Sequence, residues 1–225
     1  MMVTHPIPDS AQCCLTSVIY PFLGVKLENT LEWKSHTNTL CKKIASDCHL
    51  LRNIKKVASP EVVRLLYFAL IESKLRYGII LWGYSKHARR VLILQKRCVR
   101  TMAGAKSDPC AEVYIKDSCK PLFRSFKILT LPSLYIYCCV VFIKENPSLL
   151  STNGTHHIHN TRRRNEPCLP KHSREIFKTN PIYAGSKLFN ALPKAIKEKE
   201  GNVFKADLKE YLIQKCLYDV KDFFN

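Results

Sequence analysis

Apolar residues recur at helical spacing through three consecutive stretches in the first half of the chain. The first runs from about residue 33 to 56, with an apolar side of Leu40, Ile44, Cys48, Leu51 and Ile54. The third runs from about residue 85 to 102, with an apolar side of Val91, Leu92, Leu94, Cys98 and Val99. We expect Ser85 to cap this third helix and Gly104 to end it. Short connections between such helices predict a bundle.

The second stretch starts at Ser59 and Pro60, which suit an N-cap and a first helical position. Its expected buried side is formed by Leu66, Leu70, Ser73 and Tyr77, and its expected solvent side by Arg64, Glu72 and Arg76. Gly78 then interrupts the helical pattern, and a short apolar run ends at Trp82-Gly83. We interpret this corner as the packing centre of the bundle, with four structural residues, Tyr77, Gly78, Trp82 and Gly83.

The rest of the chain predicts a short N-terminal hairpin and a second group of helices. Residues 14–20 and 22–27 have strand character. Helices are expected at residues 120–128, 134–145 (capped by Ser133), 186–192 and 203–217, with an irregular loop at 148–181. The fold class is therefore mainly α, in five segments at residues 1–30, 31–105, 106–147, 148–181 and 182–225.

Charge adds the strongest indication of a partner. The 225 residues include 36 Lys and Arg against 18 Asp and Glu, a formal net charge of +18. Such a surplus attracts polyanions, although an acidic protein or a membrane surface could also use it. Basic residues on the helices and in the loop are the candidate nucleic-acid-binding set: Lys42, Lys43, Arg89, Arg90, Lys96, Arg97, Arg100, Arg162, Arg163 and Arg164.

The cysteines and histidines predict no metal or cofactor. The 11 cysteines include no CxxC pair, and the N-terminus lacks a secretory pattern, so we interpret most of them as small buried apolar residues. The longest apolar run, at 134–143, is about half of what a membrane helix needs. A weaker alternative is a metal cluster in the loop, formed by His156, His157 and His159 with Cys168 or His172.

The sequence offers little for catalysis by the isolated chain. Two-metal chemistry needs carboxylates that meet in space, and the aspartates are scattered. The nearest two, Asp219 and Asp222, are interpreted as a solvated or capping pair. The GxSxG elbow and the phosphate-binding glycine loops are absent from the sequence. Activity abolished by a chelator would revive the enzymatic alternative.

Several short strings, in order along some 200 residues, resemble non-LTR (LINE-type, jockey-like) retrotransposon reverse transcriptases. They are Phe22-Leu23-Gly24-Val25, Leu31-Glu32-Trp33, Glu72-Ser73-Lys74-Leu75-Arg76-Tyr77-Gly78, Trp82-Gly83, Leu94-Gln95-Lys96-Arg97, His159-Asn160-Thr161-Arg162, Tyr183 with Gly185, Leu188-Phe189-Asn190 and Leu192-Pro193. The resemblance implies a primer-grip-like hairpin at Phe22, Leu23 and Gly24, where tyrosine is usual at the first position. It also implies a thumb-like bundle at 31–105 and a post-thumb region beyond it.

This chain differs from the family in lacking a catalytic palm. In the family, the palm carries paired aspartates and precedes the region that matches here. The resemblance therefore implies part of an RNA-directed DNA polymerase that is inactive alone and binds template–primer or element RNA. Expected partners are RNA, DNA, an RNA–DNA hybrid and a full-length copy of the polymerase, in the nucleus or cytoplasm, without membrane or secretion. The alternative is a non-enzymatic interaction protein, or a transposon relic without specific nucleic-acid binding.

Overall fold

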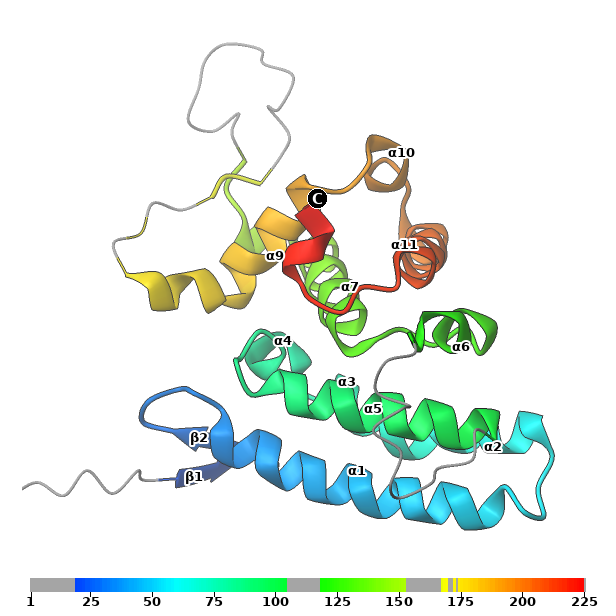
Figure 1. Cartoon of the computed structure of the whole chain (residues 1–225). Coiled ribbons are helices and arrows are strands. Elements are labelled where there is room, and N and C mark those ends of the chain that lie inside the picture. Colours follow the sequence, from blue (N-terminus) through cyan, green and yellow to red (C-terminus); the bar gives the residue numbers. More distant parts are fainter. Residues whose placement is uncertain (1–18, 105–117, 153–166, 170–171, 173, 225) are drawn as a thin grey trace, which may run out of the picture.

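The computed structural model describes residues 19–104, 118–152, 167–169, 172 and 174–224. It confirms a mainly α fold with a short N-terminal hairpin (Figure 1). The strands are β1 (Ile19–Phe22) and β2 (Val25–Glu28). The helices are α1 (Lys34–Ile54), α2 (Pro60–Leu66), η1 (Tyr67–Glu72), α3 (Ser73–Arg76), α4 (Ile79–Trp82), α5 (Ala88–Ala103), α6 (Lys120–Ser125), α7 (Leu131–Glu145), η3 (Pro147–Leu149), η4 (Glu175–Thr179), α9 (Pro181–Asn190), α10 (Lys194–Lys197), α11 (Gly201–Lys215) and η5 (Lys221–Phe224).

The helices form two layers, and Figure 1 shows α1, α2 and α5 below the group of α7, α9 and α11. In the lower layer, α1 and α5 run side by side and pack closely along their length. The predicted apolar side of α1 is buried from Leu40 to Leu51. The buried side of α5 includes Val91, Cys98 and Val99, as the spacing predicted. Helical periodicity placed these faces correctly because each helix has a single apolar side.

The predicted buried side of the 60–76 helix is wrong. Ser59 does cap α2 and Pro60 does open it. However, Ser73 and Tyr77 are exposed, and Glu72, expected in solvent, is buried. The buried side is instead formed by Val63, Tyr67, Ile71 and Leu75. Two apolar sides compete in this sequence, and the π-helical turn η1 shifts the residue spacing so that the side containing Tyr67 faces the core.

The corner after α3 is a tight turn around a buried indole. Gly78 has φ 60°, a left-handed conformation that favours glycine, and α4 begins directly after it. Trp82 is fully buried, and its Nε1–H donates to the carbonyl of Tyr77 at 3.0 Å. A Cβ added at Gly83 would lie 2.6 Å from the Ile79 carbonyl oxygen and 2.6 Å from the Tyr135 ring. The absent side chain therefore lets α4 approach α7 closely.

The start of α5 differs from the prediction. The helix begins at Ala88, and Ser85 lies in the turn before it instead of at the cap. The backbone N–H of Ser85 donates to the Trp82 carbonyl at 2.9 Å, and its carbonyl accepts from Ala88 at 3.0 Å. Ser85 is thus used by the turn that follows α4. Gly104 ends the helix with φ 79°, as expected.

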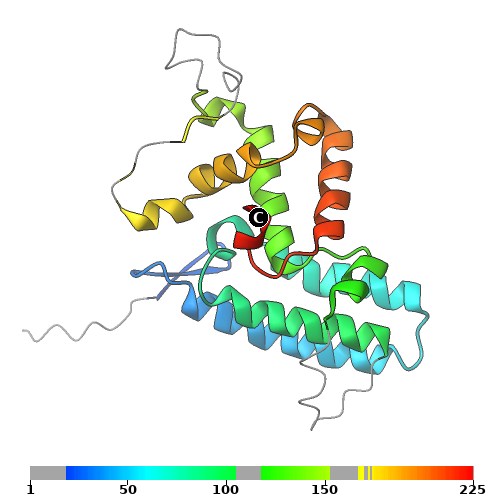
Figure 2. The ribbon, with the colours of Figure 1, turned by 45° about the horizontal axis from the view of Figure 1, so that its top comes forward.

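In the upper layer, α7 is the central element, with α9 and α11 beside it (Figure 2). It is apolar nearly all round, and most of its residues are buried. The helix begins at Leu131, so Thr130 is the cap and the predicted cap Ser133 lies inside the first turn. Thr130 Oγ1 accepts from the Ser133 backbone N–H at 3.3 Å. Pro132 lies in the same first turn, where a proline is tolerated because its missing N–H would have no partner within the helix.

The helix predicted at 186–192 begins five residues earlier, at Pro181, because Asn180 caps it through the backbone N–H of Ile182 at 2.9 Å. Part of the predicted 148–181 loop is described and contains η3, η4 and an isolated bridge between Thr152 and Pro167. The last helix, α11, buries Phe204 and Leu208 and matches its prediction to within two residues.

The hairpin also differs in register from the prediction. Phe22 pairs with Val25, so the turn is formed by Leu23 and Gly24, and Phe22 ends the first strand instead of starting the second. The part of the predicted first strand before residue 19 lies outside the described residues. Phe22 and Leu23 are 61% and 75% exposed. The hairpin lies at one end of α1 (Figure 1). Its exposed apolar side chains face solvent there.

Buried side chains of both layers form one continuous hydrophobic core, from Leu40 in α1 to Phe223 in η5. The eight cysteines of the described part are unpaired thiols, and five of them are buried. Among the described helices, none has both the length and the apolar character needed to cross a bilayer.

Candidate nucleic-acid interface

The basic side chains of α5 fall on two different sides of the helix. Arg89, Lys96 and Arg100 are spaced seven and four residues apart, so they form one stripe beside the buried side. Arg90 and Arg97 lie farther round, on the outer surface. Arg90 donates to the side-chain oxygen of Asn38 on α1 at 2.6 Å. The structure therefore separates residues that the sequence grouped together.

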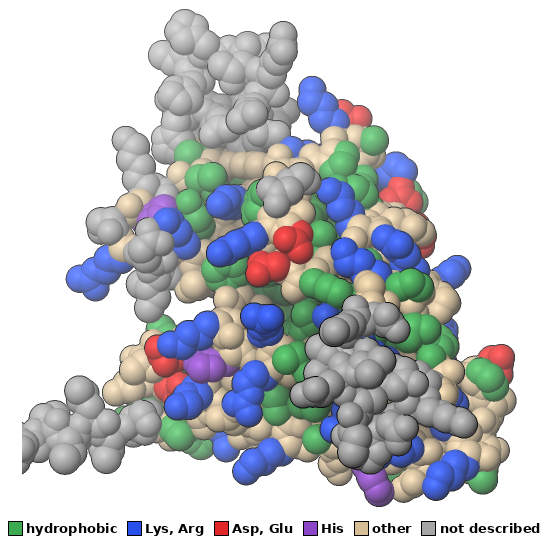
Figure 3. Space-filling view, in the orientation of Figure 1, with side chains coloured by type: hydrophobic (Ala, Val, Ile, Leu, Met, Phe, Trp, Pro, Cys, Tyr) green, Lys and Arg blue, Asp and Glu red, His purple; other side chains and the backbone are tan. Residues whose placement is uncertain are grey.

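The stripe forms one wall of a groove between the two layers, with a volume of about 1040 Å³. The other walls are the 83–86 turn, the first residues of α7 and the segment from Tyr218 to Lys221. The lining contains five cations and one carboxylate, namely Lys86, Arg89, Lys96, Arg100, Lys221 and Asp219. Figure 3 shows Lys and Arg side chains gathered on this face around hydrophobic atoms at the junction of the layers. A concave surface with this charge suits a polyanion.

Lys96 is held in the groove by an aromatic ring. Its Nζ lies 3.4 Å from the centroid of the Tyr218 ring, a cation–π contact. Lys120 Nζ lies 5.3 Å from the same centroid. Burial lowers the pKa of Lys96 from its ordinary value. The tyrosine thus positions the Lys96 ammonium where two parts of the chain meet.

One other cation, Lys86, and the carboxylate of Asp219 have identified partners in or beside the groove. Lys86 Nζ lies 2.6 Å from Glu32 Oε1 in an exposed ion pair. Asp219 Oδ1 accepts from the backbone N–H of Lys221 at 2.9 Å, and the Asp219 N–H donates to Asp222 at 3.2 Å. These two carboxylates therefore stabilise the chain turn that carries Lys221, which agrees with their interpretation as a capping pair.

Apolar and aromatic side chains also reach the groove. Tyr84 is 42% exposed, and its ring stacks on Tyr135 with centroids 6.2 Å apart and planes at 29°. Ile93 is 58% exposed and lies on α5 between Arg89 and Lys96. Exposed apolar side chains between cations distinguish this groove from a uniformly charged surface.

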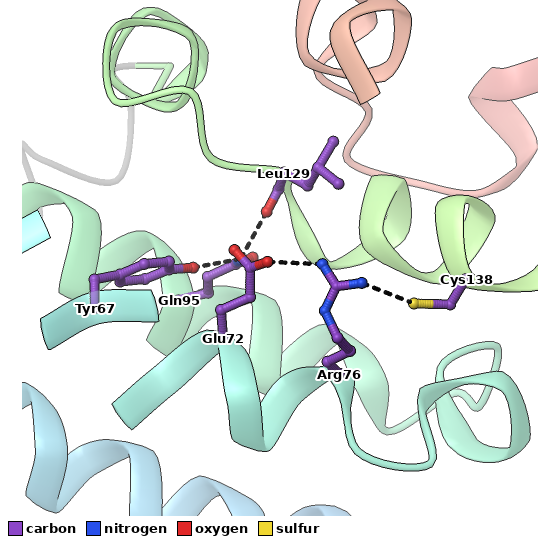
Figure 4. Close-up of polar contacts among 6 residues, drawn as sticks. All are labelled: Tyr67, Glu72, Arg76, Gln95, Leu129 and Cys138. Atoms are coloured by element: carbon purple, nitrogen blue, oxygen red, sulfur yellow. Dashed lines mark hydrogen bonds and ion pairs between the residues drawn. The ribbon is translucent and has the colours of Figure 1, made fainter. Parts of the chain in front are cut away.

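A buried glutamine holds the two layers together behind the groove (Figure 4). Gln95 Nε2 donates to the Tyr67 hydroxyl and to the Leu129 carbonyl, both at 2.9 Å. Its Oε1 accepts from the backbone N–H of Leu131 at 2.8 Å. Gln95 is fully buried, and Leu131 lines the groove. The glutamine therefore sets the position of the α7 wall relative to the α5 wall.

A second tie between the layers involves an ion pair. Arg76 donates to Glu72 Oε1 at 2.9 Å and reaches Cys138 Sγ on α7 at 3.9 Å (Figure 4). The Arg76 guanidinium also lies 5.4 Å from the centroid of the Tyr137 ring. The ion pair with Arg76 allows Glu72 to be buried, because a buried carboxylate needs a partner.

The other predicted site residues lie apart from this groove. Lys42 and Lys43 are exposed on α1, which contributes no lining residue. Phe22, Leu23 and Gly24 lie in the hairpin, where the Tyr77 hydroxyl donates to the Leu23 carbonyl. The basic run Arg162, Arg163 and Arg164 lies outside the described residues, as does the histidine cluster of 156–159. In the described part, no group of His, Cys, Asp and Glu has an arrangement suited to a metal ion.

Sequence reasoning missed most other side chains of the groove, among them Tyr84, Lys86, Tyr218 and Lys221. Lys86 lies three residues before Arg89, which was a usable signal. Tyr218 and Lys221 are far along the chain from α5, and no local pattern connects them with it.

Comparison of the chain with protein-family models, with curated proteins and with solved structures finds no match. Function must therefore be argued from the groove itself, since a mainly α fold supports many unrelated activities.

Proposed function

We propose that this protein binds nucleic acid through the phosphate backbone, in the basic groove between α5 and the segment from Tyr218 to Lys221. The observation that carries the proposal is the stripe of Arg89, Lys96 and Arg100 lining one hollow together with Lys86 and Lys221. Cations at this density neutralise phosphates and release the counterions of the polymer. Contacts of this kind position a nucleic acid with little sequence preference.

The sequence resemblance suggests where such binding would be used. We propose that the chain corresponds to the thumb and post-thumb part of a non-LTR retrotransposon reverse transcriptase. In that setting the groove would hold template–primer or element RNA, without catalysis by these residues. A polymerase assay with metal and a primed template tests the last point, because measurable extension by the pure chain would contradict it.

Binding to labelled single-stranded RNA, RNA–DNA hybrid and duplex DNA over a salt series tests the groove. The groove variant is Arg89→Gln, Arg100→Gln and Lys221→Gln, which leaves the contact between Lys96 and Tyr218 in place. The matched control removes the same charge elsewhere, by Lys42→Gln, Lys43→Gln and Arg97→Gln. If about six phosphates are neutralised, log K falls with log salt at a slope near −5 for duplex.

We expect the groove variant to bind more weakly and to lower the magnitude of that slope by about 2–3, at about 0.9 for each phosphate that is no longer neutralised. The control variant should change the slope by less than half as much. Equal effects of the two variants would show that binding is due to net charge alone. Salt-independent binding of the wild type would refute backbone recognition altogether.

The hairpin supports a second candidate function, association with a further copy of the chain. Ile19, Tyr20 and Phe22 are exposed in β1 of the two-stranded sheet, and Leu23 is exposed in the turn that follows it. Exposed apolar strands of this kind pair with other chains. Light scattering over a concentration series tests the idea with Phe22→Lys as the variant. Dimers that this change abolishes would support it, and a monomer at all concentrations would count against it.

A further inference from the structure

The groove contains two kinds of surface, and a duplex can use only one of them. Its cations suit any polyanion, but the exposed Tyr84 and Ile93 offer apolar surface. A double helix keeps its base faces stacked inside and presents phosphates, sugars and base edges. An unpaired strand presents base faces as well, and these stack on aromatic side chains.

The size of the hollow allows bases to enter it. Its volume of about 1040 Å³ is at the upper end of pockets that enclose whole small molecules, roughly 300–1000 Å³. The hollow lies between the two layers instead of on a convex surface, so a rigid duplex would contact its rim. A flexible single strand can follow the floor.

Tyr84 is held in a fixed position by the elements around it. Gly83 precedes it, and the missing Cβ at that residue allows close contact with Tyr135. The buried Tyr135 ring packs beside Tyr84 in an offset stack, with centroids 6.2 Å apart and an interplanar angle of 29°. A fixed, half-exposed ring costs little conformational entropy when a ligand stacks on it.

One apolar side chain, Ile93, lies between two cations of the stripe on α5. Ile93 lies four residues after Arg89 and three before Lys96, and helix neighbours at these spacings are about 5–6 Å apart. A base lying over Ile93 would therefore have a cation on either side for its flanking phosphates.

We propose that the groove selects unpaired nucleic acid over duplex, with a base stacked on Tyr84, an apolar contact at Ile93 and phosphates on Arg89 and Lys96. The inference rests on the proposed nucleic-acid binding and names the form of nucleic acid that the same groove takes.

The test compares an RNA strand with the RNA–DNA hybrid formed from the same strand, and with an abasic strand of equal length. The protein variants are Tyr84→Ala, Tyr84→Leu and Tyr84→Phe. Tyr20→Ala is the matched control, since Tyr20 is also an exposed tyrosine but lies in the hairpin. Thermal unfolding of each variant reports whether the packing of Tyr135 survives.

We expect the wild type to bind the RNA strand at least about tenfold more tightly than the hybrid or the abasic strand. Tyr84→Ala and Tyr84→Leu should each lose about tenfold for the RNA strand, with little change for the hybrid. Tyr84→Phe keeps the ring and should bind like the wild type, as should Tyr20→Ala. The salt slope of the Tyr84 variants should stay at the wild-type value, because stacking releases no counterions.

Equal affinity for strand and hybrid, or a Tyr84→Leu variant that binds the RNA strand like the wild type, would overturn the inference. Neither result would affect the proposed backbone binding, which fails if the wild type binds independently of salt or if the groove-cation variant behaves like its matched control. The two proposals can therefore fail separately.

Discussion

Replacing Gln95 by methionine tests whether the two helical layers are joined by polar contacts. Methionine has a similar length and suits a buried position on α5, but it can neither donate nor accept the hydrogen bonds of the amide. The change leaves the Leu129 carbonyl, the Leu131 N–H and the Tyr67 hydroxyl without this partner. Leu131 is the first residue of α7, so its N–H has no acceptor within the helix.

The expected loss follows from counting these groups. A buried polar group left without its partner costs about 1–3 kcal/mol, so three of them predict a loss of at least ~3 kcal/mol. The loss is large beside a total unfolding free energy of about 5–15 kcal/mol. With an m value of about 2 kcal/mol/M, the urea midpoint should fall by about 1.5 M.

Urea unfolding followed by tryptophan fluorescence measures this loss, with two controls. Leu92→Met makes an apolar exchange of similar volume on the buried side of α5 and should cost less than about 1.5 kcal/mol. Tyr67→Phe removes only one of the three contacts and should cost about 1 kcal/mol. A Gln95→Met variant within about 1 kcal/mol of the wild type, at unchanged m value, would refute the reasoning, because the amide would then contribute little net stability.

Three further predictions concern other parts of the fold. Burial lowers the pKa of His36 below its ordinary value, so the unfolded chain binds more protons than the folded chain. The free energy of unfolding should therefore fall as pH drops below about 6.5. Urea midpoints between about pH 7.5 and 5 measure this fall, which should be smaller in His36→Gln. Gly83→Ala should lower stability by about 1–3 kcal/mol through its clash with Tyr135, and a thermal midpoint equal to the wild type would contradict the close approach of α4 and α7. Tyr77→Phe removes the exposed hydrogen bond to Leu23 and should cost under about 1 kcal/mol, so a larger loss in calorimetry would show that the hairpin depends on it.

Periodicity was sufficient for the parts of the fold in which one side of a helix is clearly apolar. This was so for α1 and α5. It failed where the sequence offers two apolar sides, as between residues 60 and 76. There the outcome depends on Gln95 and Arg76, because these side chains provide partners for the Tyr67 hydroxyl and the Glu72 carboxylate. Such partners lie on other turns or other helices, and helical spacing cannot reveal them.

The candidate site was predictable only in part for the same reason. The sequence shows that α5 is basic, and Arg89, Lys96 and Arg100 were among the predicted residues. That Arg90 and Arg97 lie outside the groove could not be predicted, because the sequence does not show which side of α5 faces the groove. The cap of α7 shows the same limit, since Thr130 and Ser133 are both good caps. The choice of Thr130 is tied to its second contact, a hydrogen bond from its hydroxyl to the Leu217 carbonyl at 2.6 Å.

That contact joins residues 87 positions apart, and it fastens the segment that forms the far wall of the groove. During synthesis the cations of α5 therefore leave the ribosome well before Tyr218 and Lys221 can enclose them. Contacts of such long sequence separation form late and slowly. Under the proposed function, a nascent chain would thus pass through a period in which it attracts nucleic acid by charge alone, and the proposed preference for unpaired strands would be acquired only when the turn from Tyr218 to Lys221 docks.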